Sequence, residues 1–197
     1  MDKVASSVRI IKTELIRKFI HFLIALSPLM AAWNHSLTLV MLMTGILAYI
    51  YIENMRLNGV STPLISALTA MAARQRDEGR FVFGPVTLGL GALLVLVLFP
   101  PQAAAIAIYA LAFGDGFASL IGKPFGRLRP AFMSGKSVEG SVSCFLAVFF
   151  VTWRVSHSLS VSLMAALTAS LVEALPLEDF DNIALPLAVA LAVTVLI

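Results

Sequence analysis

The sequence predicts an all-α membrane protein, a polytopic bundle of about seven transmembrane helices preceded by an amphipathic helix. Two observations predict this fold class. Hydrophobic residues make up 59% of the 197 residues and charged residues only 13%, about half of the charged fraction that is usual in a soluble domain. The apolar residues also gather into long runs separated by short basic segments, which is typical of helices that span a bilayer.

The composition excludes several other classes of protein. A disordered chain is poor in apolar residues, which this chain is not. A disulfide scaffold needs paired cysteines, and Cys144 is the only cysteine. The net charge is only +3, and the basic residues flank apolar runs, so the expected partner is a lipid bilayer and not a nucleic acid. The sequence carries no signal for the oligomeric state.

Residues 1–18 are predicted to form an amphipathic helix at the membrane surface. Val4, Val8, Ile11 and Leu15 recur at spacings of three or four, while lysine and arginine side chains lie off that apolar stripe. A solvated basic tail is the alternative interpretation. The segment is too charged for a signal peptide, and no cleavage site of small residues follows it.

Seven apolar segments follow and are predicted to form a single transmembrane domain over 19–197. Most have about 16 residues, whereas a hydrocarbon core of about 30 Å needs about 20, so some helices must extend beyond these boundaries. A further apolar stretch at 63–73 is too short to span and is predicted to be interfacial or re-entrant, and counts of six or eight spans stay open. The seven segments are 19–33, 36–52, 84–99, 101–121, 138–155, 158–175 and 183–197.

The distribution of lysine and arginine predicts the orientation in the membrane. If the N-terminus is cytoplasmic, 13 of the 14 Lys and Arg residues lie on the cytoplasmic side and only Arg154 lies outside. The positive-inside rule expects such an asymmetry from a correct topology. We therefore expect a multi-pass protein with its N-terminus inside and its C-terminus outside.

Four acidic residues lie at or just inside the ends of predicted spans, namely Asp115, Glu139, Glu173 and Asp181. An acidic residue at the centre of a spanning helix costs about 2.5–3.5 kcal/mol on insertion scales, and such residues usually serve a function. In the predicted topology all four lie at the cytoplasmic face. Carboxylates that converge there need cations between them, either Lys and Arg side chains or a divalent metal ion.

The segment 113–140, FGDGFASLIGKPFGRLRPAFMSGKSVEG, has the composition of a nucleotide site. Glycines allow close backbone approach, backbone N–H groups with Lys and Arg bind phosphates, and a neighbouring Asp can bind Mg²⁺. Neither GxxxxGK[ST] nor GxGxxG is present, and a glycine-rich helix-packing segment followed by a basic loop is the alternative. The candidate nucleotide-binding residues are Gly114, Gly116, Gly122, Lys123, Gly126, Arg127, Lys136 and Gly140.

A second polar segment, EALPLEDFDNIALP at 173–186, gathers acidic residues between the last two predicted spans. Glu173 ends one span and Asp181 opens the next. Asp181 or Asn182 can cap a helix that begins near Ile183. This capping does not account for the other acidic residues, so a metal site and a solvated acidic loop both stay open.

Three polar residues, Arg17, Lys18 and His21, enter the membrane together at the first span. Arg17 and His21 are four residues apart and share a helical face. Arg17 and Lys18 can anchor the span at its cytoplasmic end, whereas His21 lies one turn into the apolar segment, where polar residues are less expected. No spacing of His and Cys indicates zinc, and no GxSxG motif is present.

Four segments, in this order, resemble the CTP-dependent lipid kinases, a family that includes dolichol kinase, phytol kinase and the yeast-type diacylglycerol kinase. Phe180 stands where that family often has a second acid, which leaves the last metal ligand open. The chain is much shorter than dolichol kinase and matches the catalytic part only. The four segments cover about 50 residues and are ELIRKFIHF (14–22), FGDGFASLIGKPFGRLR (113–129), GKSVEGS (135–141) and VEALPLEDFDNIALP (172–186).

The resemblance implies a membrane-embedded kinase that transfers the γ-phosphate of CTP to a lipid alcohol at the cytoplasmic face. The alcohol would be a polyprenol, a phytol-like isoprenoid alcohol or diacylglycerol. Phosphatidate cytidylyltransferase, which is distantly similar and also uses CTP, is one alternative. A small transporter is another, although charges gathered at one membrane face disfavour it.

The resemblance also implies the roles of individual residues. Asp115 is expected to bind Mg²⁺ with Glu173 and Asp181 as partners, and Lys136 and Lys123 are expected to contact phosphates. The residues carried over by position are Arg17, Lys18, His21, Asp115, Gly122, Lys136, Glu139, Gly140, Glu173, Asp181 and Asn182.

The resemblance leaves the catalytic roles of Glu139, Arg17 and His21 open between two possibilities each. Glu139 is expected to be a metal ligand or the general base. Arg17 and His21 are expected to hold phosphate or to activate the hydroxyl of the alcohol. With Asp115 and Lys136, these three residues form the predicted catalytic set.

Overall fold

The computed structural model describes residues 17–19, 21–60 and 79–197, which form helices and loops and contain no strand. The predicted amphipathic helix therefore lies almost entirely outside the described residues, and the predicted interfacial helix at 63–73 lies wholly outside them. The elements are η1 (Ile24–Leu26), α2 (Ser27–Trp33), α3 (His35–Leu57), α5 (Gly84–Leu98), α6 (Pro101–Tyr109), η3 (Ala110–Asp115), α7 (Gly116–Phe125), η4 (Ala131–Met133), α8 (Val138–Ser156), α9 (Leu159–Ala174) and α10 (Asp181–Thr194).

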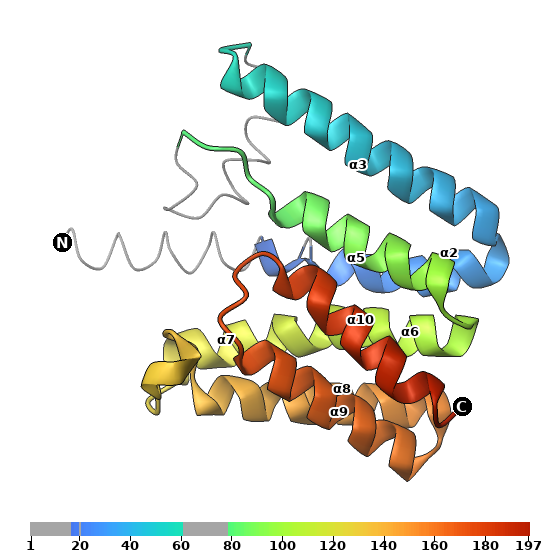
Figure 1. The fold of residues 1–197 in the computed structure, drawn as a ribbon, viewed down its shortest axis with the longest axis vertical. Helices are drawn as coiled ribbons and strands as arrows, with labels where there is room; N and C mark the ends of the chain where they lie inside the picture. Colours follow the sequence, from blue (N-terminus) through green and yellow to red (C-terminus); the bar gives the residue numbers. More distant parts are fainter. Residues whose placement is uncertain (1–16, 20, 61–78) are drawn as a thin grey trace.

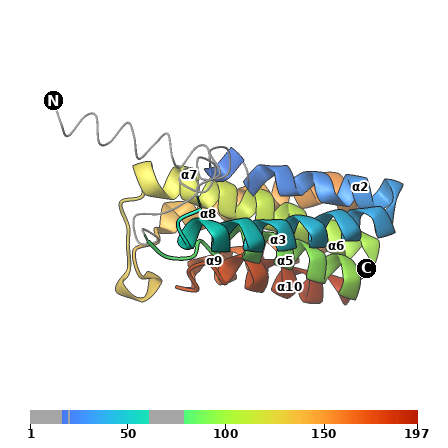
Figure 2. The same cartoon turned by 90° about the horizontal axis from the view of Figure 1, so that it is seen from above.

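The helices lie side by side, and the chain reverses direction after α2, α3, α5, α7, α8 and α9 (Figures 1 and 2). The end of α3 and the start of α5 therefore lie at the same end of the bundle as the loops after α7 and α9 (Figure 1). The short turns after α2, α5 and α8 lie at the other end, together with the C-terminus (Figure 1). This alternation agrees with the up-and-down order that the sequence predicts for 19–197.

Three segments in the described part are long and apolar enough to cross a membrane, namely His35–Leu57, Pro101–Phe125 and Val138–Ser156. The apolar helices Gly84–Leu98, Leu159–Ala174 and Asp181–Thr194 are shorter. The all-helical class is thus confirmed. A bundle in which seven helices all cross the membrane stays a prediction.

Several helix boundaries differ from the predicted spans because charged residues continue the helices. α3 reaches Leu57, five residues beyond the predicted end at 52. There Arg56 donates hydrogen bonds of 2.8 and 2.7 Å to the buried Glu53 carboxylate. The central run ends at Phe125 and not at 121, and α10 begins at Asp181 and ends at Thr194 instead of spanning 183–197. Hydropathy drops at such residues, although a paired charge is compatible with a helix.

The central helix of the bundle is the run formed by α6, η3 and α7. In its most apolar part 56% of the residues are buried, compared with 6% in α3, which lies at the edge. Small alanines such as Ala103, Ala107 and Ala110 allow the neighbouring helices to approach it closely. Large apolar side chains cover the outside instead, among them Phe150, which is 61% exposed. A lipid environment explains such an apolar exterior.

A close contact between α5 and α10 sets the position of the acidic end of α10. Pro186 has no N–H, so the carbonyl of Asn182 has no partner within the helix. A Cβ added at Gly91 would lie 2.1 Å from that carbonyl oxygen. A glycine is therefore required here for α5 to pack against the first turn of α10.

Candidate active site

A cavity of about 620 Å³ opens at the end of the bundle that carries the loops after α7 and α9. This volume lies within the range of small-molecule sites, roughly 300–1,000 Å³. Acidic and basic side chains both line it, which indicates a charged ligand. The lining residues are Arg17, Lys18, Asp115, Ala118, Ser119, Gly122, Lys123, Arg129, Ser134, Gly135, Lys136, Ser137, Gly140, Glu173, Pro176, Glu178 and Asp181.

Asp115 is the last residue of η3, a π-helical turn inside the central run. Such turns are rare and often mark functional positions. The Lys18 ammonium lies 2.5 Å from Asp115 Oδ2 and also donates to the Asp115 carbonyl oxygen at 3.2 Å. The Lys18 side chain is only 4% exposed. This pair is therefore a buried connection between the central run and the helical residues 17–19 and 21–23, which are called the first helix below.

His21 lies one turn after Lys18 and supports the same pair. Its Nε2 is 3.0 Å from the carbonyl oxygen of Leu111 and 3.3 Å from Asp115 Oδ2. Because a carbonyl oxygen only accepts hydrogen bonds, Nε2 carries a proton and donates. His21 is buried and lies outside the cavity lining, so it contacts the site through Asp115.

The two glycines that flank Asp115 serve helix packing. A Cβ added at Gly116 would lie 2.5 Å from the ring of Phe22, and one at Gly114 would lie 2.9 Å from Val148. Neither glycine lines the cavity. Their small size lets the first helix and α8 approach the central run, and this approach brings Lys18 and His21 to Asp115.

Lys136 lies between two further carboxylates of the cavity, Glu173 and Asp181. Its ammonium donates to the backbone carbonyl of Glu173, and it lies 3.8 Å from Glu173 Oε1 and 3.6 Å from Asp181 Oδ2. Ser141 donates to the other Glu173 oxygen, Oε2, at 2.8 Å. The Lys136 side chain is 24% exposed, so this cation is in contact with the cavity opening.

A glycine contact between α7 and α8 joins the two halves of the cavity. A Cβ added at Gly122 would lie 2.8 Å from Ser137 Oγ and 3.1 Å from Gly140 Cα. Ser137 is the N-cap of α8, accepts from the Gly140 N–H at 3.1 Å and donates to the Gly122 carbonyl at 3.3 Å. The KSVEG sequence therefore ends the loop, begins α8 and binds α8 to α7.

The loop between α7 and α8 is held by two charged residues. Glu139 accepts the backbone N–H groups of Arg127 and Leu128 at 2.9 and 3.2 Å. Arg129 donates to the carbonyl of Gly122 at 2.7 Å and to that of Gly135. Glu139 thus lies outside the cavity lining and anchors the loop that forms one wall.

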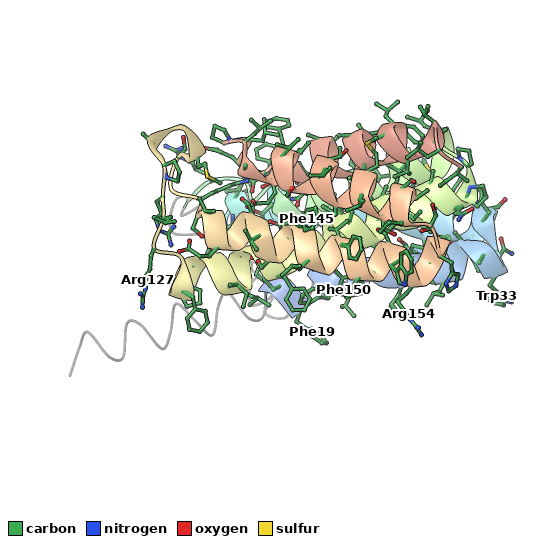
Figure 3. The ribbon with its side chains drawn as sticks, turned by 90° about the horizontal axis from the view of Figure 1, so that it is seen from below. Phe19, Trp33, Arg127, Phe145, Phe150 and Arg154 are labelled. Atoms are coloured by element: carbon green, nitrogen blue, oxygen red, sulfur yellow. The ribbon has the colours of Figure 1, made fainter. Side chains whose placement is uncertain are left out.

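The remaining predicted residues lie around the cavity. Arg127 is exposed at the cavity end and points away from the helices (Figure 3). Gly126 packs against Ser137, since an added Cβ would lie 2.3 Å from its Oγ. Asn182 donates to Thr87 Oγ1 at 3.0 Å and thereby joins α10 to α5.

The structure thus divides the predicted site residues into two sets. Those in the cavity lining are Arg17, Asp115, Gly122, Lys123, Lys136, Gly140, Glu173 and Asp181. Those outside the lining are His21, Gly114, Gly116, Gly126, Arg127, Glu139 and Asn182.

Four serines belong to the site although the sequence analysis does not select them. Ser119, Ser134 and Ser137 line the cavity, and Ser141 binds Glu173. The positions of Ser137 and Ser141 could have been predicted from the sequence. A serine before an apolar helix is a typical N-cap, and a residue four positions later lies on the same helical face. Ser134 could not have been predicted in this way, because its position depends on the path of the loop.

The carboxylates of the cavity are potential oxygen ligands for Mg²⁺. Among the described residues, no group of three His, Cys, Asp or Glu side chains is arranged to hold a metal ion. Mg²⁺ is usually bound by one or two carboxylates together with substrate phosphates. Glu173 and Asp181 already share one cation, the Lys136 ammonium, so this pair has the chemistry for a divalent ion that arrives with phosphates.

Curated proteins similar to this chain carry one activity in their names. A probable chloroplastic phytol kinase of Triticum aestivum is 25% identical over 93% of this chain. Phytol kinase 1, chloroplastic, of Arabidopsis thaliana is 29% identical over 69% of it. A phytol kinase of Synechocystis sp. is 30% identical over 75% of it.

The similarity does not extend over the whole length of these relatives. The chain covers 67% of the wheat protein, 51% of the Arabidopsis protein and 66% of the Synechocystis protein. No family model matches the chain, and no solved structure matches it significantly.

Proposed function

The chain belongs to the family of lipid kinases that contains the phytol kinases, and from this premise we propose that it is a membrane-embedded kinase of a lipid alcohol. The donor is a nucleoside triphosphate, CTP by the resemblance of its motifs, and the product is a lipid monophosphate. One observation carries the proposal. A cavity at one end of an apolar helical bundle is lined by four carboxylates and by several Lys and Arg side chains, which suits a metal–triphosphate complex that meets a lipid.

The cations of the cavity would bind and orient the triphosphate. Lys123, Lys136 and Arg17 line the cavity and can neutralise phosphate oxygens. Phosphoryl transfer depends mainly on positioning and on such charge neutralisation, since little covalent chemistry falls to the protein.

Glu173 and Asp181 would hold a divalent cation, with Asp115 as a third carboxylate of the cavity. When bound, Mg²⁺ would supply charge that bridges the phosphates. In the absence of the nucleotide, the Lys136 ammonium balances the same two carboxylates. Lys136 would then turn toward a phosphate when the nucleotide enters.

The alcohol needs a hydrogen-bond acceptor that orients its hydroxyl group toward the γ-phosphate. The carboxylates that line the cavity can provide it. Glu139 is less suited, because its oxygens accept loop N–H groups outside the cavity. We therefore assign to Glu139 the role of holding the loop.

An isoprenoid alcohol of the phytol type is the first substrate to test, because the relatives are named phytol kinases. The experiment uses the purified full chain in lipid nanodiscs with CTP or ATP labelled at the γ-phosphate. Phytol, a polyprenol and diacylglycerol are offered in parallel. We expect label in the lipid and release of CDP, with Asp115→Asn as the inactive control.

Two results would contradict the kinase assignment. In a parallel reaction that offers phosphatidate, label that leaves as pyrophosphate, with CMP joined to phosphatidate, would identify a cytidylyltransferase. Absence of transfer to each alcohol from both nucleotides, in protein that is folded by circular dichroism, would reject lipid kinase activity.

We further propose that the cavity faces the cytoplasm. Arg127 lies at the cavity end and Arg154 toward the other end (Figure 3), as the positive-inside rule requires. In a Cys144→Ser background, single cysteines at Lys123 and Asp179 are expected to be protected from an impermeant thiol reagent in intact cells. A cysteine at Asn34 is expected to react, and labelling at position 123 from outside would reverse the orientation.

A further inference from the structure

Three aromatic side chains, Phe145, Phe149 and Trp153, form a row along one face of α8. They are spaced four residues apart, and their rings lie almost parallel. The ring centroids of Phe145 and Phe149 are 6.2 Å apart at 10°, and those of Phe149 and Trp153 are 6.3 Å apart at 17°. These three stacked rings are called the α8 aromatic row below.

The row begins directly at the candidate active site. Ser141 lies one helical turn before Phe145 on the same face. Its hydroxyl donates to Glu173 Oε2, whereas Glu173 Oε1 lies on the side of Lys136. The Glu173 carboxylate thus has one oxygen toward the cations of the cavity and the other at the start of the row.

The row lies along the contact between α8 and α9, where Phe145 and Phe149 also pack partly against the core. Ser141 reaches Glu173 on α9, so this face of α8 is turned toward α9. Figure 3 shows Phe145 on that side and Phe150 on the opposite side of α8. Trp153 is 40% exposed and the two phenylalanines are half-buried, so the rings remain accessible from the surrounding lipid.

The length of the row fits a long hydrocarbon chain. Along the helix axis, Trp153 lies about 18 Å beyond Ser141. This distance is more than half of the roughly 30 Å hydrocarbon core of a bilayer. A lipid tail that follows the row would leave its polar end at the cavity and its other end deep among the acyl chains.

We propose that the α8 aromatic row binds the tail of the lipid alcohol, with the hydroxyl group donating to Glu173 Oε2 beside Ser141. This inference rests on the proposed kinase function and names the substrate class of the same site, a long and flexible primary alcohol. Methyl and methylene groups pack well on ring faces. The row therefore presents the hydroxyl to the carboxylate at the border between membrane and cavity.

A second aromatic cluster near the site is already filled by the chain itself. Phe22 packs on Phe113 and Phe117 at 5.7 and 5.9 Å between ring centroids. Its ring also covers Gly116, where an added Cβ would lie 2.5 Å away. This cluster therefore serves the packing of the first helix on the central run.

The kinetic test replaces the rings and retains apolar side chains. In Phe145→Leu/Phe149→Leu we expect the KM for phytol to rise about tenfold through lost ring packing. The KM for the nucleotide and the kcat/KM for a short alcohol such as 3-methyl-2-butenol are expected to stay unchanged. Phe19→Leu, which changes an exposed phenylalanine outside the row, is the matched control and is expected to behave as the wild type.

The outcomes separate this inference from the proposed function. If the wild type phosphorylates phytol and the double variant keeps its KM, the row is rejected as the tail site while the kinase assignment stands. If the wild type phosphorylates none of the alcohols, the kinase assignment fails, and a binding experiment decides the role of the row.

That binding experiment uses a long-chain primary alcohol with a diazirine at the far end of its tail. After photolysis of wild-type protein in nanodiscs, we expect labelled peptides from the second half of α8 and the facing part of α9. Excess phytol is expected to reduce the label. Label on the first helix or α7 around Phe22 and Phe117, or label that phytol does not reduce, would overturn the inference.

Discussion

Two lysine–carboxylate groups line the cavity, and they differ in how firmly the lysine is held. Lys18 lies 2.5 Å from Asp115 and its side chain is 4% exposed. Lys136 lies 3.8 and 3.6 Å from Glu173 and Asp181 and is 24% exposed. The first group is a buried ion pair that belongs to the fold, whereas the second is a cation position open to exchange. The cavity thus combines a fixed half with an exchangeable half.

The difference follows from where each lysine lies in the chain. Lys18 lies on the first helix, which packs against the central run through Phe22 and Gly116. Lys136 lies at the end of the loop before α8, and its ammonium contacts one backbone carbonyl and, at longer range, two carboxylates. A ligand can therefore replace the Lys136 ammonium at low cost, while removal of Lys18 leaves a buried carboxylate without its main partner.

The largest expected effect is that of Asp115→Asn, which breaks the fixed half. Turnover is expected to fall by roughly 10²–10³-fold, as for the loss of a preorganised charged group. The buried Lys18 loses its counterion, so stability is also expected to fall, by about 3–5 kcal/mol. Thermal unfolding in detergent and single-turnover phosphate transfer measure the two effects.

A double variant separates these two effects. Lys18→Met/Asp115→Asn removes both charges and is expected to recover most of the lost stability, because a neutral pair needs no counterion. Its turnover is expected to stay low. Near-normal turnover in Asp115→Asn would remove Asp115 from the mechanism and reduce the fixed half to a structural ion pair.

Lys136→Met is expected to affect the exchangeable half with less effect on stability. Turnover is expected to fall about 10²-fold through a lost phosphate contact, while the midpoint of thermal unfolding falls less than in Lys18→Met. Without nucleotide, Glu173 and Asp181 lose the ammonium that they share, so Mn²⁺ binding measured by electron paramagnetic resonance is expected to tighten. Equal loss of stability in Lys18→Met and Lys136→Met would contradict the distinction between the halves.

Gly122→Ala tests the contact that joins the halves. An added Cβ would lie 2.8 Å from Ser137 Oγ and 3.1 Å from Gly140 Cα, so α7 and α8 must move apart. We expect about a tenfold loss of turnover through misplacement of the site, measured with phytol and γ-labelled CTP. The control is Gly45→Ala on α3, where nothing lies within 4 Å, and its turnover is expected to be unchanged.

The smallest expected effect is that of Glu139→Gln. The amide oxygen of Gln can still accept the N–H groups of Arg127 and Leu128, so a loop anchor survives and turnover is expected to fall less than tenfold. A general base would be abolished by the same change. The steady-state rate therefore decides between the two roles, and a loss of several hundredfold would return Glu139 to the catalytic set.

Much of this architecture can be read from the sequence because the bilayer imposes strong constraints. Apolar runs must become helices when no water is present to satisfy the backbone. The described helices therefore follow the predicted order closely, for example Val138–Ser156 against 138–155. Boundaries near paired charges, such as Glu53 and Arg56 in α3, could not be predicted, because hydropathy does not show whether a charge has a partner.

The candidate site was predictable to a different degree for each type of residue. Acidic residues at the ends of apolar runs had to meet cations, and Asp115, Glu173 and Asp181 do share one cavity with Lys18 and Lys136. The glycines around Asp115 and the carboxylate of Glu139 belong to the same sequence motifs, but they lie outside that cavity. A motif records that a residue type is needed, and does not show whether it is needed for a ligand or for packing.

The sequence by itself determined the helical class, the order of the helices and the gathering of charge at one end, because these depend on local hydropathy and on the cost of burying charge in lipid. Only the tertiary structure decided which lysine pairs with which carboxylate. It also decided that Ser141 connects Glu173 to the α8 aromatic row. Such pairings join residues far apart in the chain, and they depend on how closely helices approach through glycines and the π-helical turn, which local sequence does not encode.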